Sequence, residues 1–185
     1  MIGKLDQIIA RSLRKLAEDT HVRSWCAKEH DWVNYFAHRY LLGECSPRGP
    51  LKEAGQIGLD VAVPQPPGCG YDKQSVGRDL VIWPKCGDTC FDVNWKATKH
   101  PLAILEWKIH RPRYPNRRVE HERVWLRNYC KWQPSVVSYA VEINGRCSPT
   151  TLDCTRFLAS TEDEDWLRLT LKAGHPVIRL QRTRQ

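Results

Sequence analysis

The sequence predicts an α/β fold in which a mixed β-sheet is flanked by helices. Apolar residues recur at helical spacing in two segments of the first 42 residues, and from residue 56 onward they recur with the period of a strand. A further helical segment and a further strand follow, so the predicted order is helices, three strands, a helix and a strand. A sheet with helices on its faces is the simplest packing for that order.

Two amphipathic helices are predicted before the first strand. In the first, residues 1–15 and their continuation, the apolar positions at helical spacing are Leu5, Ile8, Ile9, Leu13 and Leu16. In the second, residues 29–42, the positions i, i+3, i+4, i+7 and i+8 are Trp32, Tyr35, Phe36, Arg39 and Tyr40. Gly43 is expected to end this second helix.

Three strands are predicted next, at residues 56–63, 77–83 and 102–109. In the first strand the alternating apolar residues, expected on one side, are Ile57, Leu59, Val61 and Val63. Pro84 stops the second strand, because proline has no N–H to donate to a ladder. The polar segment 85–100 then connects the second strand to the third.

The remaining chain is predicted to form a helix and further strands. Residues 119–132 have the helical pattern, and the expected buried anchors are Val124, Leu126 and Tyr129. A strand is predicted at 135–143, before the turn signal at Asn144. The tail is expected to contain strands at 166–171 and 176–180.

The length of 185 residues and the composition favour one globular domain. Hydrophobic residues make up 41% and charged residues 27%, which is ordinary for a folded protein. The net charge of +8 favours a polyanionic partner, usually nucleic acid. No apolar stretch reaches transmembrane length and no secretory signal is found, so we expect a cytoplasmic protein without a membrane partner.

An acid and a base two residues apart close the apolar run of the third strand. Glu106 and Lys108 share one face of this strand, with Cα atoms roughly 6.5–7 Å apart, because side chains i and i+2 point the same way. Asp79 begins the apolar run of the second strand and converges with Glu106 if the two strands are neighbours. Two carboxylates and a backbone carbonyl form an oxygen-rich site of the kind Mg²⁺ prefers, and Lys108 would assist the attacking water or neutralise phosphate charge.

The same residues have a simpler interpretation. Glu106 and Lys108 would then be a surface ion pair on an edge strand, and Asp79 would be a cap at a strand start. An acid and a lysine at this spacing are common by chance, so the residues alone leave both interpretations open.

Two segments resemble the motifs of the PD-(D/E)xK nuclease superfamily, the restriction-endonuclease-like fold: GRDLVI at 77–82 and ILEWK at 104–108. The resemblance covers about residues 29–143 and implies an αβββαβ core. In this view residues 1–185 form a single nuclease-like domain, in which 1–28 add an N-terminal helix and 144–185 a C-terminal extension.

The resemblance also implies an activity, metal-dependent hydrolysis of phosphodiester bonds with Mg²⁺ or Mn²⁺ and no organic cofactor. Asp79 and Glu106 match the metal-binding acids, and the backbone carbonyl of Trp107 would be a further ligand. Lys108 matches the catalytic lysine. Nucleic acid is the expected partner, with DNA favoured over RNA, and cutting both strands of a duplex would favour a homodimer.

The sequence departs from the family pattern in three places. Arg78 stands where the signature has proline, and the distance from Asp79 to Glu106 requires the inserted segment 85–100. The additional acid that many members carry has four candidates: Glu29, Glu44, Glu53 and Asp60. We rank Asp60 first as a further metal ligand, because it faces away from the apolar set of its strand.

A basic cluster follows the third strand and is expected to hold the nucleic-acid backbone. It comprises Arg111, Arg113, Arg117, Arg118, Arg123 and Arg127. The alternative is a solvated helix face with Glu–Arg pairs, which would explain the helix but not the loop at 111–118. His110 and His121 lie nearby as candidate proton carriers, although packing or surface roles are more common for such residues.

Two further functions compete with a nuclease. One is a catalytically silent nucleic-acid-binding module of the same fold. The other is a zinc-stabilised interaction protein built around Cys86 and Cys90. Among the eight cysteines this is the closest pair, and no second pair at zinc-finger spacing accompanies it, so free thiols are expected.

Overall fold

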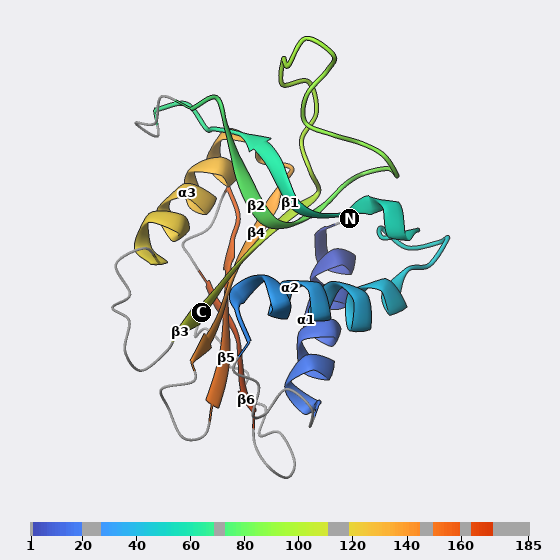
Figure 1. Cartoon of the computed structure of the whole chain (residues 1–185), viewed down its shortest axis with the longest axis vertical. Helices are drawn as coiled ribbons and strands as arrows, with labels where there is room; N and C mark the ends of the chain where they lie inside the picture. Colours follow the sequence, from blue (N-terminus) through green and yellow to red (C-terminus); the bar gives the residue numbers. More distant parts are fainter. Residues whose placement is uncertain are drawn as a thin grey trace.

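A mixed sheet with helices on both of its faces forms the centre of the protein (Figure 1). The computed structural model describes residues 2–19, 27–68, 73–110, 119–144, 150–159 and 164–171, and in these residues the sheet has six strands. The α-helices of this part of the chain are α1 (Ile2–Glu18), α2 (Glu29–Phe36) and α3 (Val119–Trp132). The strands are β1 (Ile57–Pro64), β2 (Ser75–Ile82), β3 (Ala103–His110), β4 (Val137–Asn144), β5 (Thr150–Phe157) and β6 (Glu164–Leu171). The predicted α/β class is confirmed.

The strands lie in the sheet in chain order, β1-β2-β3-β4-β5-β6. β3 and β4 run parallel, and the other neighbours are antiparallel. A parallel pair needs a crossover connection, and α3 supplies it on one face of the sheet. The order α2-β1-β2-β3-α3-β4 is the predicted succession of a helix, three strands, a helix and a strand.

The region after residue 144 differs from the prediction. β5 was not predicted, yet it joins β4 to β6 within the same sheet. Its only apolar side chains are Leu152, Cys154 and Phe157, and the pairing with β6 shifts register between Cys154 and Thr155. The shift leaves out Trp166 of β6, so β5 itself stays regular. β5 gives little sequence signal because its few apolar side chains are divided between its two faces: Leu152 and Cys154 face the larger core and Phe157 faces the smaller one. The predicted strand at 166–171 is confirmed as part of β6, while 176–180 lies outside the described residues.

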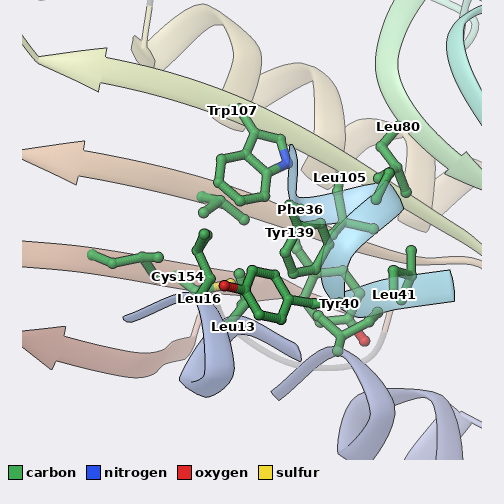
Figure 2. Close-up of a cluster of buried hydrophobic side chains, with 14 of the residues drawn as sticks. Leu13, Leu16, Phe36, Tyr40, Leu41, Leu80, Leu105, Trp107, Tyr139 and Cys154 are labelled. Carbon is green, nitrogen blue, oxygen red and sulfur yellow. The ribbon is translucent and has the colours of Figure 1, made fainter. Parts of the chain in front are cut away.

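The larger core lies between the sheet and the helices α1 and α2 (Figure 2). All five apolar residues predicted for the first helix are at most 5% exposed. Trp107 of β3 points into this core, where its ring centroid lies 5.1 Å from that of Phe36. In the described part of the chain, no helix is both long and apolar enough to cross a membrane.

The smaller core lies under α3, on the opposite face of the sheet (Figure 1). Leu126 and Tyr129 are buried there as predicted. Val124 is not: it is 40% exposed, and Trp125 is buried in its place, stacked on Tyr129 with centroids 4.9 Å apart. The two aromatic rings are four residues apart, so they share a helix face that excludes Val124.

The prediction that one side of β1 stays apolar along its whole length was wrong. Ile57 and Leu59 pack against the larger core, whereas Val61 and Val63 pack against the smaller one. Between them Asp60 has a φ of 50°, and the ladder with β2 omits it. At this left-handed residue β1 changes the side that its apolar residues face, so that Val61 and Val63 face α3. Gly58 permits the bend, because a Cβ there would lie 2.6 Å from Val61.

Candidate functional site

The candidate site lies where β2 and β3 separate. Their ladder ends at the pair Leu80–Leu105. One residue further on, the Asp79 carboxylate accepts a hydrogen bond from the Trp107 backbone N–H at 2.7 Å. The side chain of Asp79 therefore replaces the strand partner that β2 no longer provides. Because a strand residue directs its N–H and C=O to the same edge, the Trp107 carbonyl also points toward this gap.

Glu106 is buried beside Asp79 on the face that carries α3. Its side chain is 6% exposed, and its Oε1 accepts a hydrogen bond from Arg78 Nη1 at 2.9 Å. Burial raises the pKa of Glu106 to about 8, although the Arg78 charge acts in the opposite direction. The single guanidinium contact thus compensates only part of the desolvation of this acid.

Lys108 is held between carboxylates from two helices. Its Nζ lies 2.7 Å from Glu29 of α2 and 3.2 Å from Glu122 of α3. Burial disfavours the charged form of Lys108, but the hydrogen bond to Glu29 and the charges of Glu122 and Asp79 outweigh it and raise the pKa. Burial raises the pKa of both Glu29 and Glu122 as well. Glu29 is the first residue of α2, so the start of this helix brings a carboxylate to Lys108, which lies 79 residues later in the sequence.

The predicted catalytic residues Asp79, Glu106 and Lys108 line one cleft with a volume of about 740 Å³. Its other lining residues include the charged or polar side chains of Gln65, Lys73, Arg78, His121, Glu122 and Trp125. The structure therefore brings together the three residues that the sequence selected from two strands. It adds Arg78, Glu29 and Glu122, of which only Glu29 was among the candidates for an additional acid.

Asp60, the first-ranked candidate for an additional acid, is exposed and does not line the cleft. Its carboxylate nevertheless lies near the rim, since a Cβ at the lining residue Gly77 would be 3.1 Å from Asp60 Oδ1. Glu44, another candidate, is bound instead by Arg11 and Lys15 of α1. Glu29 is the candidate that contacts Lys108, and a helix start facing a strand end is not visible in sequence spacing.

The predicted basic cluster is described only in part. Its members Arg111, Arg113, Arg117 and Arg118 lie outside the described residues. Arg123 pairs with Glu142, which also lies 2.8 Å from His110 Nε2. Arg127 lies with its Cζ 5.9 Å from the ring centroid of Phe157. His121, the other candidate proton carrier, lines the cleft.

The donor set of the site fits a hard divalent cation. Among the described residues, no three His, Cys, Asp or Glu side chains are grouped to hold a metal ion. Mg²⁺, however, is usually bound by one or two carboxylates, with waters and substrate phosphates completing its shell. Arg78 and Lys108 lie among four carboxylates, Glu29, Asp79, Glu106 and Glu122, and burial raises the pKa of Glu29, Glu106 and Glu122. A divalent cation at Asp79 and Glu106 would favour the charged forms of these acids.

The cysteines of the described residues are free thiols and do not form a cluster. Cys86 is exposed and Cys90 is buried, and the groups of His, Cys, Asp or Glu searched in this part of the chain include none that would hold zinc with them. The remaining three cysteines, Cys26, Cys69 and Cys147, lie outside the described residues.

Comparisons with protein-family models, with curated proteins and with solved structures find no match to this chain. The function is therefore inferred from the geometry of the cleft.

Proposed function

We propose that this protein is a metal-dependent nuclease that hydrolyses phosphodiester bonds, with DNA favoured over RNA as the substrate. The observation that carries the proposal is the shared cleft of Asp79, Glu106 and Lys108, whose lining joins two acids and a lysine from neighbouring strands. The order α2-β1-β2-β3-α3-β4 supports it too, because the resemblance to the PD-(D/E)xK superfamily implies this succession.

Each residue has a role that follows from its surroundings. The carboxylates of Asp79 and Glu106, with the Trp107 carbonyl, would hold Mg²⁺ or Mn²⁺, which when bound supplies Lewis acidity and an activated water. Lys108 has a raised pKa and is therefore an ammonium ion at neutral pH. It suits stabilisation of the charge that develops on the phosphate better than removal of a proton from water. Glu29 and Glu122 hold its amine in place.

One observation favours the alternative, a catalytically silent nucleic-acid-binding module. The Arg78 guanidinium already pairs with Glu106, so a protein that never binds metal would keep this arrangement. The two functions differ in what Glu106→Gln does. This change preserves shape and removes the charge that a metal requires.

The test is a cleavage screen with single- and double-stranded DNA and RNA, in Mg²⁺ or Mn²⁺ and in a chelator. We expect metal-dependent cleavage by the parent and none by Glu106→Gln. Cleavage by Glu106→Gln at the parental rate would overturn the proposal. Tight nucleic-acid binding without cleavage under every metal condition would favour the silent module instead.

A further inference from the structure

Arg78 is a buried arginine whose hydrogen-bonding capacity is mostly unused. Its side chain is 7% exposed, and its Nη1 donates to Glu106. Its Nε is buried and has no hydrogen-bond partner. A guanidinium carries five N–H donors, and burying it with one bonded carboxylate compensates poorly for the lost hydration. Arg78 therefore lies in the cleft with N–H donors that Glu106 does not use.

A second contact holds Arg78 independently of Glu106. Its Cζ lies 3.6 Å from the ring centroid of Trp125, a close cation–π arrangement. The indole is itself fixed, because its Nε1 donates to Gln65 Oε1 at 2.5 Å. Arg78, Trp125 and Gln65 all line the cleft. The indole face can thus retain the guanidinium in the cleft even if its bond to Glu106 is broken.

The position of Arg78 makes it a competitor of a metal. It precedes Asp79 in β2 and pairs with Glu106, and these are the two carboxylates that would hold the cation. A guanidinium and a divalent cation at Glu106 neutralise the same charge. The cleft wall beside Arg78 also carries Lys73 and His121, so a displaced guanidinium would meet a basic surface suited to an anion.

We propose that Arg78 is an exchangeable cation that links metal binding to substrate binding. In the free protein it pairs with Glu106. When a divalent cation binds at Glu106, Arg78 stays stacked on Trp125 and turns its donors to a phosphate group of the nucleic-acid backbone in the cleft. This inference rests on the proposed nuclease function and assigns the substrate phosphate a binding residue on β2, outside the basic cluster.

The exchange predicts opposite effects on the two ligands. In Arg78→Gln, Glu106 has lost its internal cation, so Mn²⁺ should bind roughly tenfold more tightly. The same variant has lost a charged donor to phosphate, so the KM for a duplex oligonucleotide should rise by roughly tenfold or more. A purely structural arginine would instead weaken both interactions together with the melting temperature.

The experiment is a calorimetric titration of the full chain with Mn²⁺ alone, followed by steady-state cleavage of a duplex oligonucleotide. Arg156→Gln is the matched control. Arg156 also pairs with a carboxylate, Asp6 at 2.8 Å, and lies over an indole, Trp166, at 5.8 Å, but it belongs to β5 and does not line the cleft. Its replacement should leave both the Mn²⁺ affinity and the KM at parental values.

Arg78→Lys provides a second variant if Arg78→Gln does not fold. A lysine keeps one charge for Glu106 but has no planar fork for phosphate, so the Mn²⁺ affinity should stay near parental while the KM rises. Unchanged Mn²⁺ affinity in Arg78→Gln, or an unchanged KM in both variants, overturns the exchange. If the parent still cleaves with metal, the nuclease proposal survives that result. If neither the parent nor Arg78→Gln binds Mn²⁺, both proposals are overturned.

Discussion

The carboxylate of Asp79 accepts a hydrogen bond from the backbone N–H of Trp107, 28 residues later, at the point where their strands stop pairing. One side chain thus closes the edge of β3 at the position proposed for a metal ligand. Trp107 itself is fully buried, and its ring packs against Phe36 in the larger core. The position of the proposed metal site is therefore fixed by the packing on the opposite face of the sheet.

Replacements of Asp79 should separate its two roles. Asp79→Asn keeps an oxygen that accepts from Trp107 and removes a charge that repels Glu106 and Glu29, so it should melt at or above the parental temperature. Asp79→Ala leaves a buried N–H unpaired, which costs about 1–3 kcal/mol. That cost should lower the melting temperature by roughly 2–12 °C. Thermal melts of the parent and both variants test whether Asp79→Asn melts at or above the parental temperature and Asp79→Ala below it.

The same melts test metal binding. Mg²⁺ should raise the melting temperature of the parent but of neither Asp79 variant. An equal Mg²⁺ response in all three proteins would show that Asp79 only closes the strand edge.

Lys108 should matter for rate rather than for metal affinity. Lys108→Met keeps most of the side-chain volume but removes the ammonium, so cleavage should slow by roughly 10²-fold or more. Mn²⁺ affinity should not fall, because the lost charge is positive. Lys108→Arg is the control that keeps the charge and should retain more activity. Parental rates in Lys108→Met, measured at saturating metal, would contradict a catalytic role.

Glu44 should give a defined pH dependence of stability. Partial burial acts against its charged form, but the hydrogen bonds from Arg11 and Lys15, with Nη2 and Nζ each 2.7 Å away, hold its pKa below the ordinary value of 4.5. A carboxyl group whose pKa is lower in the folded than in the unfolded protein stabilises the fold at pH values above its unfolded pKa. This contribution is lost as the pH falls through the folded pKa. Arg11 and Lys15 are about half exposed, so the contribution is at most about 1 kcal/mol.

The comparison is between the parent and Glu44→Gln in urea unfolding from pH 7 to pH 3. The variant should be less stable at pH 7, and the difference should shrink as the pH falls below 4.5 and through the lowered pKa of Glu44. A difference that stays constant from pH 7 to the lowest pH would mean that Glu44 contributes through packing.

Local patterns in the sequence were sufficient for most of the fold. The stripe from Leu5 to Leu16 predicts α1, because burial on one helix face repeats with the helical period. Alternation predicts β1 as a strand, but it does not reveal the change of side at Asp60, which depends on a left-handed backbone angle. β5 was missed for a different reason: its three apolar side chains are divided between its two faces and separated by polar residues, so no apolar alternation identifies it.

The site was predictable only where its residues end apolar strands. Asp79, Glu106 and Lys108 stand out as charges at the ends of buried runs. Their partners do not, because Arg78 meets Glu106 and Glu29 meets Lys108 through tertiary packing across 28 and 79 residues of sequence. Arg78 looked like a departure from a family signature, whereas in the structure it is the counter-ion of Glu106.

The thiols should be reduced and should differ in reactivity. We expect eight titratable thiols in denaturant without reductant and no stoichiometric zinc by elemental analysis. In the native protein Cys86 is exposed and should react fastest among the described cysteines. Cys90 should react slowly, because burial raises its pKa to about 12. One zinc per chain, lost in Cys86→Ser or Cys90→Ser, would instead support the zinc-stabilised interaction protein.

The basic cluster should make DNA binding depend on salt. Each phosphate neutralised by arginine releases counterions, so the logarithm of the affinity should fall linearly with the logarithm of the salt concentration. Replacing Arg113, Arg117 and Arg118 together with Ala should remove roughly three such contacts and lower the slope by about 2–3. The measurement is fluorescence anisotropy of a labelled duplex without metal, in salt from about 50 to about 200 mM, a roughly fourfold range. Replacing Arg11, Lys15 and Lys4 of α1 is the charge-matched control and should leave the slope closer to that of the parent. An identical slope in the parent and the triple loop variant would show that these arginines form a solvated surface and do not contact the nucleic acid.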